Sequence, residues 1–208
     1  MSVKRKVFVS FRFNDGNKIK DKLVDFLEER DLVIDKSEDV DRREMSEETI
    51  QKYLFDKLKD SSITLVLLTP EAVNYSRKPN GDIDDWLYDE LRYSLYNRDG
   101  NPINGAIALY TPQTENIIIQ KSTHRCDKCN KDTTVSIITN FDNLVKDNMM
   151  NVKPKFKMNQ CDNIFDSDYD SYISLVKLED FYNQPEKYLE ITTSKRKDSE
   201  NYTIHVRK

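Results

Sequence analysis

The chain has 208 residues, and its 33 Lys and Arg stand against 37 Asp and Glu, which gives a formal net charge of −4. This balance excludes a generally basic nucleic-acid-binding protein, so we expect no nucleic-acid partner. Only four glycines and two histidines occur, which excludes a glycine-rich phosphate loop, a dinucleotide fingerprint and a His-Glu-x-x-His metal site. Aromatic residues make up 10% of the chain, which is too many for a disordered protein.

The first part of the chain alternates short apolar runs with stretches of helical periodicity. The apolar runs predict four buried strands, at residues 7–11, 32–34, 63–68 and 105–110. A helix is expected over 17–30, between the first two strands. A second helix follows Ser46, which suits an N-cap, and a third helix follows Asp84 or Asp85.

The regular alternation stops after the fourth strand. Residues 111–170 are rich in Asn, Asp, Lys and Thr and carry only isolated strand-like runs, at 117–119 and 135–138, so we interpret them as an insertion. A fifth strand at 172–176 then precedes a helix over 178–191 that is interrupted near its proline.

Strands that alternate with helices require right-handed crossovers, which place parallel strands in one sheet with both faces covered. The expected fold is therefore α/β, with a doubly wound, flavodoxin-like parallel sheet flanked by helices and an insertion before the last strand. Residues 1–192 form one domain in this interpretation, and residues 193–208 form a charged C-terminal extension with an edge strand at 202–206. No apolar run is long enough to cross a bilayer and the N-terminus lacks a signal peptide, so we expect a cytoplasmic protein without a membrane partner.

In such sheets, ligands bind beyond the carboxyl ends of the strands. The first strand leads into a segment that includes Ser10, Phe11, Arg12, Asn14 and Asp15. The acidic loop after the second strand contains Asp41, and the helix after the third strand carries Trp86 and Glu90. We expect these residues to converge on one site. The alternatives are that Ser10, Asn14 and Asp15 only form a turn and that the acidic loop is a solvated face. Phe11 is equally interpretable as a core aromatic.

Trp86 and Glu90 stand one helical turn apart, on a different face from the apolar stripe formed by Leu87, Leu91 and Leu95. One interpretation is a tryptophan at the core boundary that packs over a solvated glutamate. The other is a carboxylate in an aromatic-walled cleft, where partial loss of water strengthens its field on a bound cation. The spacing leaves both interpretations open.

Three segments of the chain resemble TIR-like domains. The sequence VFVSFRFND at residues 7–15 is similar to their opening strand and polar loop, and WLYDEL at 86–91 resembles their Trp-x-x-x-Glu helix segment. Residues 171–188 are similar to the C-terminal segment of the bacterial TIR-like proteins of Thoeris antiphage defence, the ThsB group. The resemblance covers residues 4–110 and 170–192, and it implies a TIR-like form of the doubly wound sheet.

The resemblance implies an enzyme that takes NAD as its substrate and cleaves the bond between nicotinamide and ribose. Glu90 falls on the family's catalytic glutamate and would stabilise a transition state that resembles an oxocarbenium ion. Nicotinamide leaves as a neutral group and needs no general acid, so the lack of a catalytic histidine fits this chemistry. Phe11, Phe13 and Trp86 are candidates for stacking on nicotinamide or adenine, and Arg12 is expected to meet the pyrophosphate.

The implied product is a signalling nucleotide derived from ADP-ribose, in a linear, cyclic or conjugated form, that acts as a second messenger. A phage-derived trigger, expected to be a protein, would switch the enzyme on, a separate effector protein would read the signal, and the TIR-like domain would self-associate. Two alternatives stay open. One is a TIR-like module that only binds partners, and the other is an enzyme like the nucleoside deoxyribosyltransferases, which also use a glutamate on a related scaffold.

The insertion departs from the TIR-like pattern because it carries all three cysteines. His124, Cys126 and Cys129 lie within six residues of one another, and Cys161 would complete a Cys₃His zinc site. The alternative is a pair of exposed, reduced thiols beside a surface histidine. An odd number of cysteines is not typical of a disulfide framework, which fits a reducing compartment.

Overall fold

The structure is a computed structural model of the chain, and it describes residues 4–37, 47–73, 76–77, 83–84, 86–97, 102–138, 143–159, 161 and 163–206. The predicted helix caps Ser46 and Asp85 lie outside the described residues, as does Asp41 of the acidic loop. None of the helices in the described ranges combines the length and the apolar character that a bilayer crossing requires.

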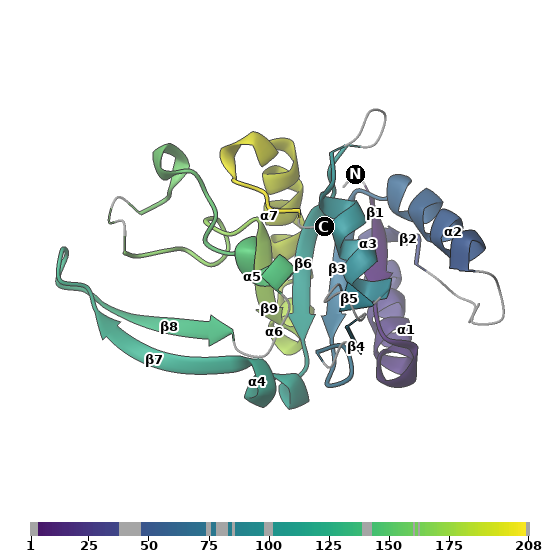
Figure 1. Ribbon diagram of the computed structural model, residues 1–208, viewed down its shortest axis with the longest axis horizontal. Helices are drawn as coiled ribbons and strands as arrows, with labels where there is room; N and C mark the ends of the chain where they lie inside the picture. The colour runs from purple at the N-terminus through teal and green to yellow at the C-terminus, as the bar shows by residue number, and fades with distance from the viewer. Residues whose placement is uncertain are drawn as a thin grey trace.

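Five parallel strands form the central sheet (Figure 1). They are β1 (Arg5–Ser10), β2 (Val33–Asp35), β3 (Ile63–Leu68), β6 (Gly105–Tyr110) and β9 (Ile173–Lys177). Their order across the sheet is β2, β1, β3, β6, β9, and every neighbouring pair is parallel. This arrangement confirms the predicted doubly wound, flavodoxin-like α/β fold, with the insertion between β6 and β9.

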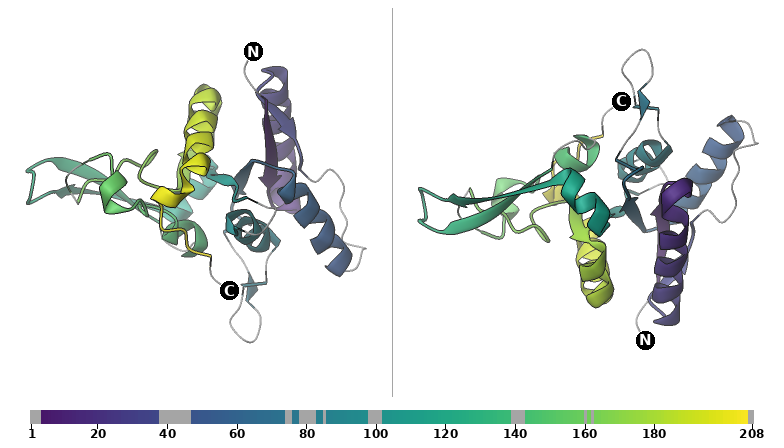
Figure 2. Two further views of the ribbon diagram at one scale, coloured as in Figure 1. Left: turned by 90° about the horizontal axis from the view of Figure 1, so that it is seen from above. Right: turned by 90° about the horizontal axis from the view of Figure 1, so that it is seen from below.

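Helices cover both faces of the sheet, and Figure 2 shows α1 and α7 on the opposite side from α3. One face carries α1 (Phe13–Glu29), α6 (Leu178–Asn183) and α7 (Pro185–Lys197). The other face carries α2 (Glu47–Lys59), α3 (Trp86–Leu95), α4 (Pro112–Ile118) and α5 (Asn143–Asp147). A short antiparallel pair, β4 (Ser76–Arg77) with β5 (Ile83–Asp84), precedes α3. Burial on both faces explains why the sequences of β3 and β6 are almost entirely apolar, with Thr64 as the polar exception in β3.

The C-terminal part of the chain follows the prediction only in part. The helix expected over 178–191 is interrupted at Pro185, as predicted, and divides into α6 and α7. However, α7 continues to Lys197 and so runs through residue 193, where the extension was expected to begin. The edge strand expected at 202–206 is not formed. Tyr202 makes a single isolated bridge with Val152, and residues 203–206 have no regular structure.

The insertion begins with a helix where the sequence predicts a strand-like run. Thr111 caps α4, since its Oγ1 accepts from the backbone N–H of Thr114 at 3.3 Å, and Pro112 occupies the first helical turn. Ile117 and Ile118 therefore belong to α4, and the prediction of a strand at 117–119 is wrong for these two residues. A cap and a helix-starting proline outweigh the β preference of consecutive isoleucines.

A β-hairpin projects from the body of the protein within the insertion (Figures 1 and 2). It pairs β7 (Ile119–Arg125) with β8 (Asp132–Ile138), and this second strand contains the predicted run at 135–138. At the base of the hairpin, Ile138 joins the hydrophobic core that also contains Ile118 of α4 and Leu144 of α5. Further out, residues 120–125 are all exposed. The outer residues of β7 are therefore not stabilised by the main core.

The close approach of α7 to β6 depends on Gly105. A Cβ at this position would lie 2.6 Å from Cγ2 of Thr192 and 2.8 Å from its backbone oxygen. Because one of the two obstacles is backbone, a side-chain rotation cannot remove it. Gly105 thus allows α7 to lie directly against the first residue of β6.

We expect Gly105→Ala to destabilise the protein by about 1–3 kcal/mol, the usual cost of overpacking a core. Urea unfolding monitored by circular dichroism measures this. Gly16→Ala is the matched control, because its Cβ would meet only the Phe11 side chain, at 3.2 Å, and alanine favours the surrounding helix. Equal stability losses in the two variants would contradict the role given to Gly105.

The helix α7 also buries a lysine. Lys195 is 3% exposed, and its Nζ donates to Oγ of Ser174 at 2.6 Å and to the backbone oxygen of Ser171 at 2.8 Å. Burial lowers the pKa of Lys195 to about 7, against the opposing charges of Asp168 and Asp166. Above this pH the folded protein holds a neutral lysine, whereas the unfolded chain keeps its proton up to the ordinary pKa of 10.5.

Between about pH 7 and 10, the unfolded chain therefore binds more protons at this residue, so the free energy of unfolding should gain a component that rises with pH. Below pH 7 the lysine is charged in both states and adds no slope. Lys195→Met should remove this component in urea titrations across the window, whereas Lys197→Met, at an exposed position on the same helix, should not. An unchanged slope in Lys195→Met would show that the buried amine does not titrate there.

Candidate active site at the ends of β1 and β3

A buried hydrogen bond joins β1 to α3. Ser10 is the last residue of β1 and has no exposed surface, and Glu90 lies in the middle of α3 and is 7% exposed. The Ser10 hydroxyl donates to Oε2 of Glu90. The two residues come from the sequence motifs at 7–15 and 86–91, so the structure brings the predicted serine and glutamate together.

The side-chain alternation of β1 explains this pairing. Val7 and Val9 point to the α1 side of the sheet, where they join the core with Leu23 and Leu27. Phe8 points to the opposite side and packs with α2 and α3. Because side chains alternate along a strand, Ser10 points to the same side as Phe8, toward α3.

The leucine stripe of α3 fixes the direction of Glu90. Leu87, Leu91 and Leu95 are buried against the sheet, as predicted. Polar contacts then hold the helix: Ser94 Oγ donates to the backbone oxygen of Glu90 at 2.8 Å and lies 2.8 Å from Oγ1 of Thr64 on β3. The backbone that carries the carboxylate is therefore tied to the middle of the sheet.

Arg12 adds a partly buried positive charge, two residues beyond Ser10. Burial lowers the pKa of its guanidinium, and the charges of Glu71, Asp15 and Glu90 raise it. Three carboxylates are thus close enough to act on this cation. The site combines a fixed carboxylate with a guanidinium that carries opposite charge.

Asp15 ties the start of α1 to the loop after β3. Its Oδ1 accepts from the hydroxyl of Thr69 at 2.7 Å, and its Oδ2 accepts from the backbone N–H of Glu71 at 2.9 Å. These contacts span the ends of β1 and β3, which is the point where the strand order of this fold reverses and where its ligands bind. Asp15 therefore organises the loop at this point.

The aromatic residues lie on different sides of the sheet. Phe11 packs against the α1 side of the core, with its ring centroid 5.0 Å from that of Phe13 and with Lys20 Nζ 5.7 Å from its own centroid. Trp86 is half-buried and packs with Phe8 and α2, on the side that carries Glu90. The contacts of Phe11 favour its interpretation as a core aromatic.

The remaining predicted residues take less part in this arrangement. Asn14 is exposed in the first turn of α1. Two residues that the sequence does not single out, Thr69 and Glu71, contribute to the site through Asp15. Thr69 directly follows β3, so the rule that ligands meet the carboxyl ends of strands would have pointed to it.

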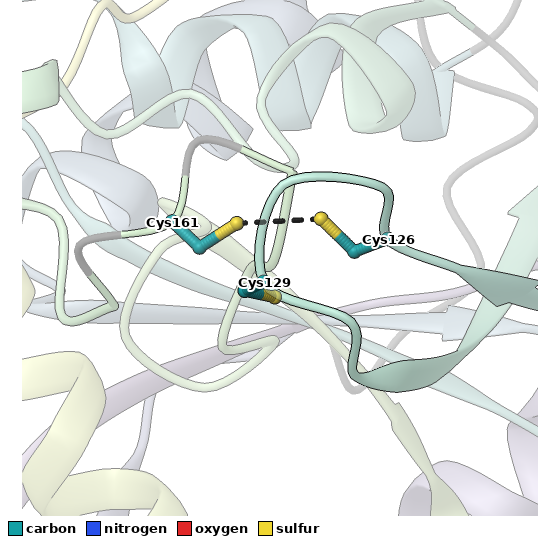
Figure 3. Close-up of side chains that lie close together, drawn as sticks. All are labelled: Cys126, Cys129 and Cys161. Carbon is teal, nitrogen blue, oxygen red and sulfur yellow. Dashed lines mark hydrogen bonds between the residues drawn. The ribbon is translucent and has the colours of Figure 1, made fainter.

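The cysteines lie elsewhere: Cys126 and Cys129 are at the tip of the hairpin, and Cys161 is on another segment of the insertion that lies beside it (Figure 3). Cys126 is buried, and its Sγ lies 3.4 Å from that of Cys161, while all three cysteine sulfurs lie within 4.8 Å of one another. The backbone N–H of Cys129 is the largest influence that lowers the pKa of the Cys126 thiol to about 6; burial opposes it and the Cys161 thiol reinforces it. His124 is exposed on β7 and does not belong to this group.

Comparison with models of protein families finds none that matches the chain. We therefore infer function from the buried carboxylate and its neighbours, together with the motifs of the sequence.

Ser10→Ala removes a hydrogen bond to a buried carboxylate, so we expect a loss of about 1.5–3 kcal/mol in the free energy of unfolding, the range for hydrogen bonds to charged groups. Ser62→Ala is the control, because Ser62 Oγ donates to a backbone oxygen at an exposed position. Its loss should stay below about 0.5 kcal/mol. Chemical denaturation of both variants measures the difference, and equal losses would argue against a strong Ser10–Glu90 contact.

Proposed function

We propose that the protein is an enzyme that consumes NAD and cleaves the bond between nicotinamide and ribose, with Glu90 as the catalytic residue. The observation that carries the proposal is the buried Glu90 carboxylate, which accepts a hydrogen bond from Ser10 at the carboxyl ends of β1 and β3. Ligands of doubly wound sheets bind at this place. The motifs at 7–15 and 86–91, which resemble TIR-like domains, support the same assignment.

The chemistry needs one anion rather than an acid–base pair. When nicotinamide leaves as a neutral group, positive charge develops on the ribose, and a nearby carboxylate stabilises it. The hydrogen bond from Ser10 holds the Glu90 carboxylate in one orientation before the reaction. Because water is largely excluded around Glu90, its charge acts more strongly on a neighbouring cation than it would in bulk solvent.

Arg12 and Trp86 complete the proposed substrate site. The guanidinium of Arg12 suits bidentate contact with a pyrophosphate, and binding the substrate would exchange carboxylate neighbours of Arg12 for phosphate oxygens. The Trp86 ring stands one helical turn before Glu90, where it can stack on a base. Asp15 would act indirectly, by holding the loop that carries Glu71.

In this proposal the protein works in the cytoplasm as the first step of an antiphage signal. A phage-derived protein triggers it, the product is an ADP-ribose-derived second messenger, and a separate effector protein reads that messenger. Self-association of the TIR-like domain belongs to the same proposal. The support for these steps is the resemblance to Thoeris proteins in the segments at 7–15, 86–91 and 171–188.

A second candidate function, a module that only binds partners, is favoured by a different observation. Of the large apolar side chains that are exposed in the described residues, most lie in the insertion, and Met158 is 64% exposed. Phe156 and Phe165 belong to the same stretch. Exposed apolar side chains that gather in one segment are typical of surfaces that bind other proteins.

Glu90→Gln tests the enzyme directly. The glutamine keeps an oxygen that accepts from Ser10 but removes the negative charge, so we expect a protein that still folds cooperatively and at least about a 100-fold loss of nicotinamide release. Purified protein is incubated with NAD and lysate of phage-infected cells, and nicotinamide is measured by chromatography. Protection of cells against phage is measured in parallel and should be lost.

Glu29→Gln is the matched control, because Glu29 is an exposed acid in the last turn of α1, at the opposite end of that helix from Asp15, and its loss of charge should leave nicotinamide release nearly intact. If Glu90→Gln retains triggered NAD turnover, the catalytic assignment is wrong. If it loses turnover and still protects cells, the binding module becomes the better account of the function.

A further inference from the structure

One residue at the tip of the β7–β8 hairpin, Cys126, is buried although the residues on both sides of it are exposed. Residues 120–125 are exposed, yet Cys126, the next residue, has no accessible surface. A second segment of the insertion covers it, because Cys161, 35 residues later in the chain, places its Sγ 3.4 Å from that of Cys126 (Figure 3). Asn163 of the same segment donates from Nδ2 to the Cys126 sulfur at 3.5 Å.

The backbone of the tip folds Cys126 and Cys129 toward the same point. The backbone N–H of Asn130 donates to the oxygen of Cys126 at 2.8 Å, and the N–H of Cys126 donates to the oxygen of Lys131 at 2.9 Å. Asn130 has a φ of 55°, in the left-handed region that asparagine tolerates better than most residues. This tight turn reverses the chain directly after the second cysteine.

The segment that carries Cys161 is also held by its own contacts. The backbone N–H of Cys161 donates to Oδ1 of Asn159 at 2.8 Å, and its backbone oxygen accepts from the N–H of Ile164 at 3.1 Å and from the amine of Lys157. Hydrogen bonds to its backbone N–H and to its backbone oxygen therefore hold the residue that presents the third thiol to the hairpin tip.

The spacing of the three sulfurs matches a metal better than a disulfide. Zinc binds thiolate sulfur at about 2.3 Å in a tetrahedron, which separates two sulfurs by about 3.8 Å. The sulfurs here lie within 4.8 Å of one another, and the nearest pair lies 3.4 Å apart. A disulfide would require about 2.05 Å and could join only two of the three. Thiolates are soft ligands that select zinc among the common divalent cations.

We infer that Cys126, Cys129 and Cys161 together bind one zinc ion that clamps the tip of the hairpin to the segment around residue 161. The clamp has a clear structural role, since an isolated two-stranded hairpin is marginally stable in water. It supplies the cross-link that the exposed residues 120–125 cannot supply by packing.

His124 is not a ligand of this zinc. It stands on β7 opposite Thr133, is exposed, and lies outside the group of three sulfurs. The inference thus differs from the Cys₃His site that the sequence predicts. It is also independent of Glu90 and NAD, because the hairpin tip lies away from the ends of β1 and β3 (Figure 1).

The test measures zinc in the full chain, expressed with zinc and purified without chelator. Wild type should contain about one zinc per chain. Cys126→Ser, Cys129→Ser and Cys161→Ser should each lose nearly all of it, whereas His124→Ala should keep the wild-type content. Circular dichroism of every variant checks that the central domain is folded, because the cysteines lie outside its core.

A second measurement reports the clamp itself. Chelation of zinc from the wild type should open the tip to trypsin at Arg125, Lys128 and Lys131, and re-addition of zinc should restore protection. The inference is overturned if the wild type neither contains zinc nor binds added zinc, if mass spectrometry finds a Cys126–Cys161 disulfide in the freshly purified protein, or if His124→Ala loses zinc as the cysteine variants do.

Discussion

Burial of both faces of the central sheet is the constraint on which the rest of this structure depends. β3 and β6 are buried along their whole length, so polar side chains in the sheet must either find partners inside the protein or lie at the strand ends. Thr64 finds partners inside the protein, since its hydroxyl forms hydrogen bonds with the Ser94 hydroxyl and the side-chain amide of Asn104. Ser10 stands at a strand end, where its hydroxyl meets a carboxylate instead of apolar neighbours. The same burial that stabilises the domain thus concentrates its chemistry at one edge of the sheet.

The pattern of apolar residues was sufficient to predict the fold, because burial of both sheet faces requires apolar side chains at consecutive positions of the central strands. Runs such as the one at 63–68 have no periodicity of 3.6 residues, and they alternate with helices at regular distance along the chain. The pattern was less informative where local signals compete, as at Ile117 and Ile118. There, a cap at Thr111 determines the helix, and the β preference of the side chains does not.

The candidate site could be predicted as a set of residues but not as an arrangement. Ser10 and Glu90 are far apart in the sequence, and only the packing of α3 against β1 brings them into contact. Strand alternation could have separated Ser10 from Phe11 in advance, since neighbours on a strand point to opposite faces. The carboxylates around Arg12 and the exclusion of His124 from the cysteine cluster depend on loop geometry, which no periodicity in the sequence records.

The position of the insertion also bears on the order in which the protein folds. Within the sheet, β6 and β9 are separated by the longest stretch of chain, since Ala106 pairs with Ile173, whereas Val7 pairs with Ile63 in β1 and β3. Closing a longer loop costs more chain entropy. We therefore expect the pairing of β9 with β6 to form later than the other strand pairs of the sheet. The hairpin of β7 and β8 consists of local contacts, and its formation shortens the loop that remains to be closed. Early formation of this hairpin thereby offsets part of the entropic cost that the insertion adds to the pairing of the last strand.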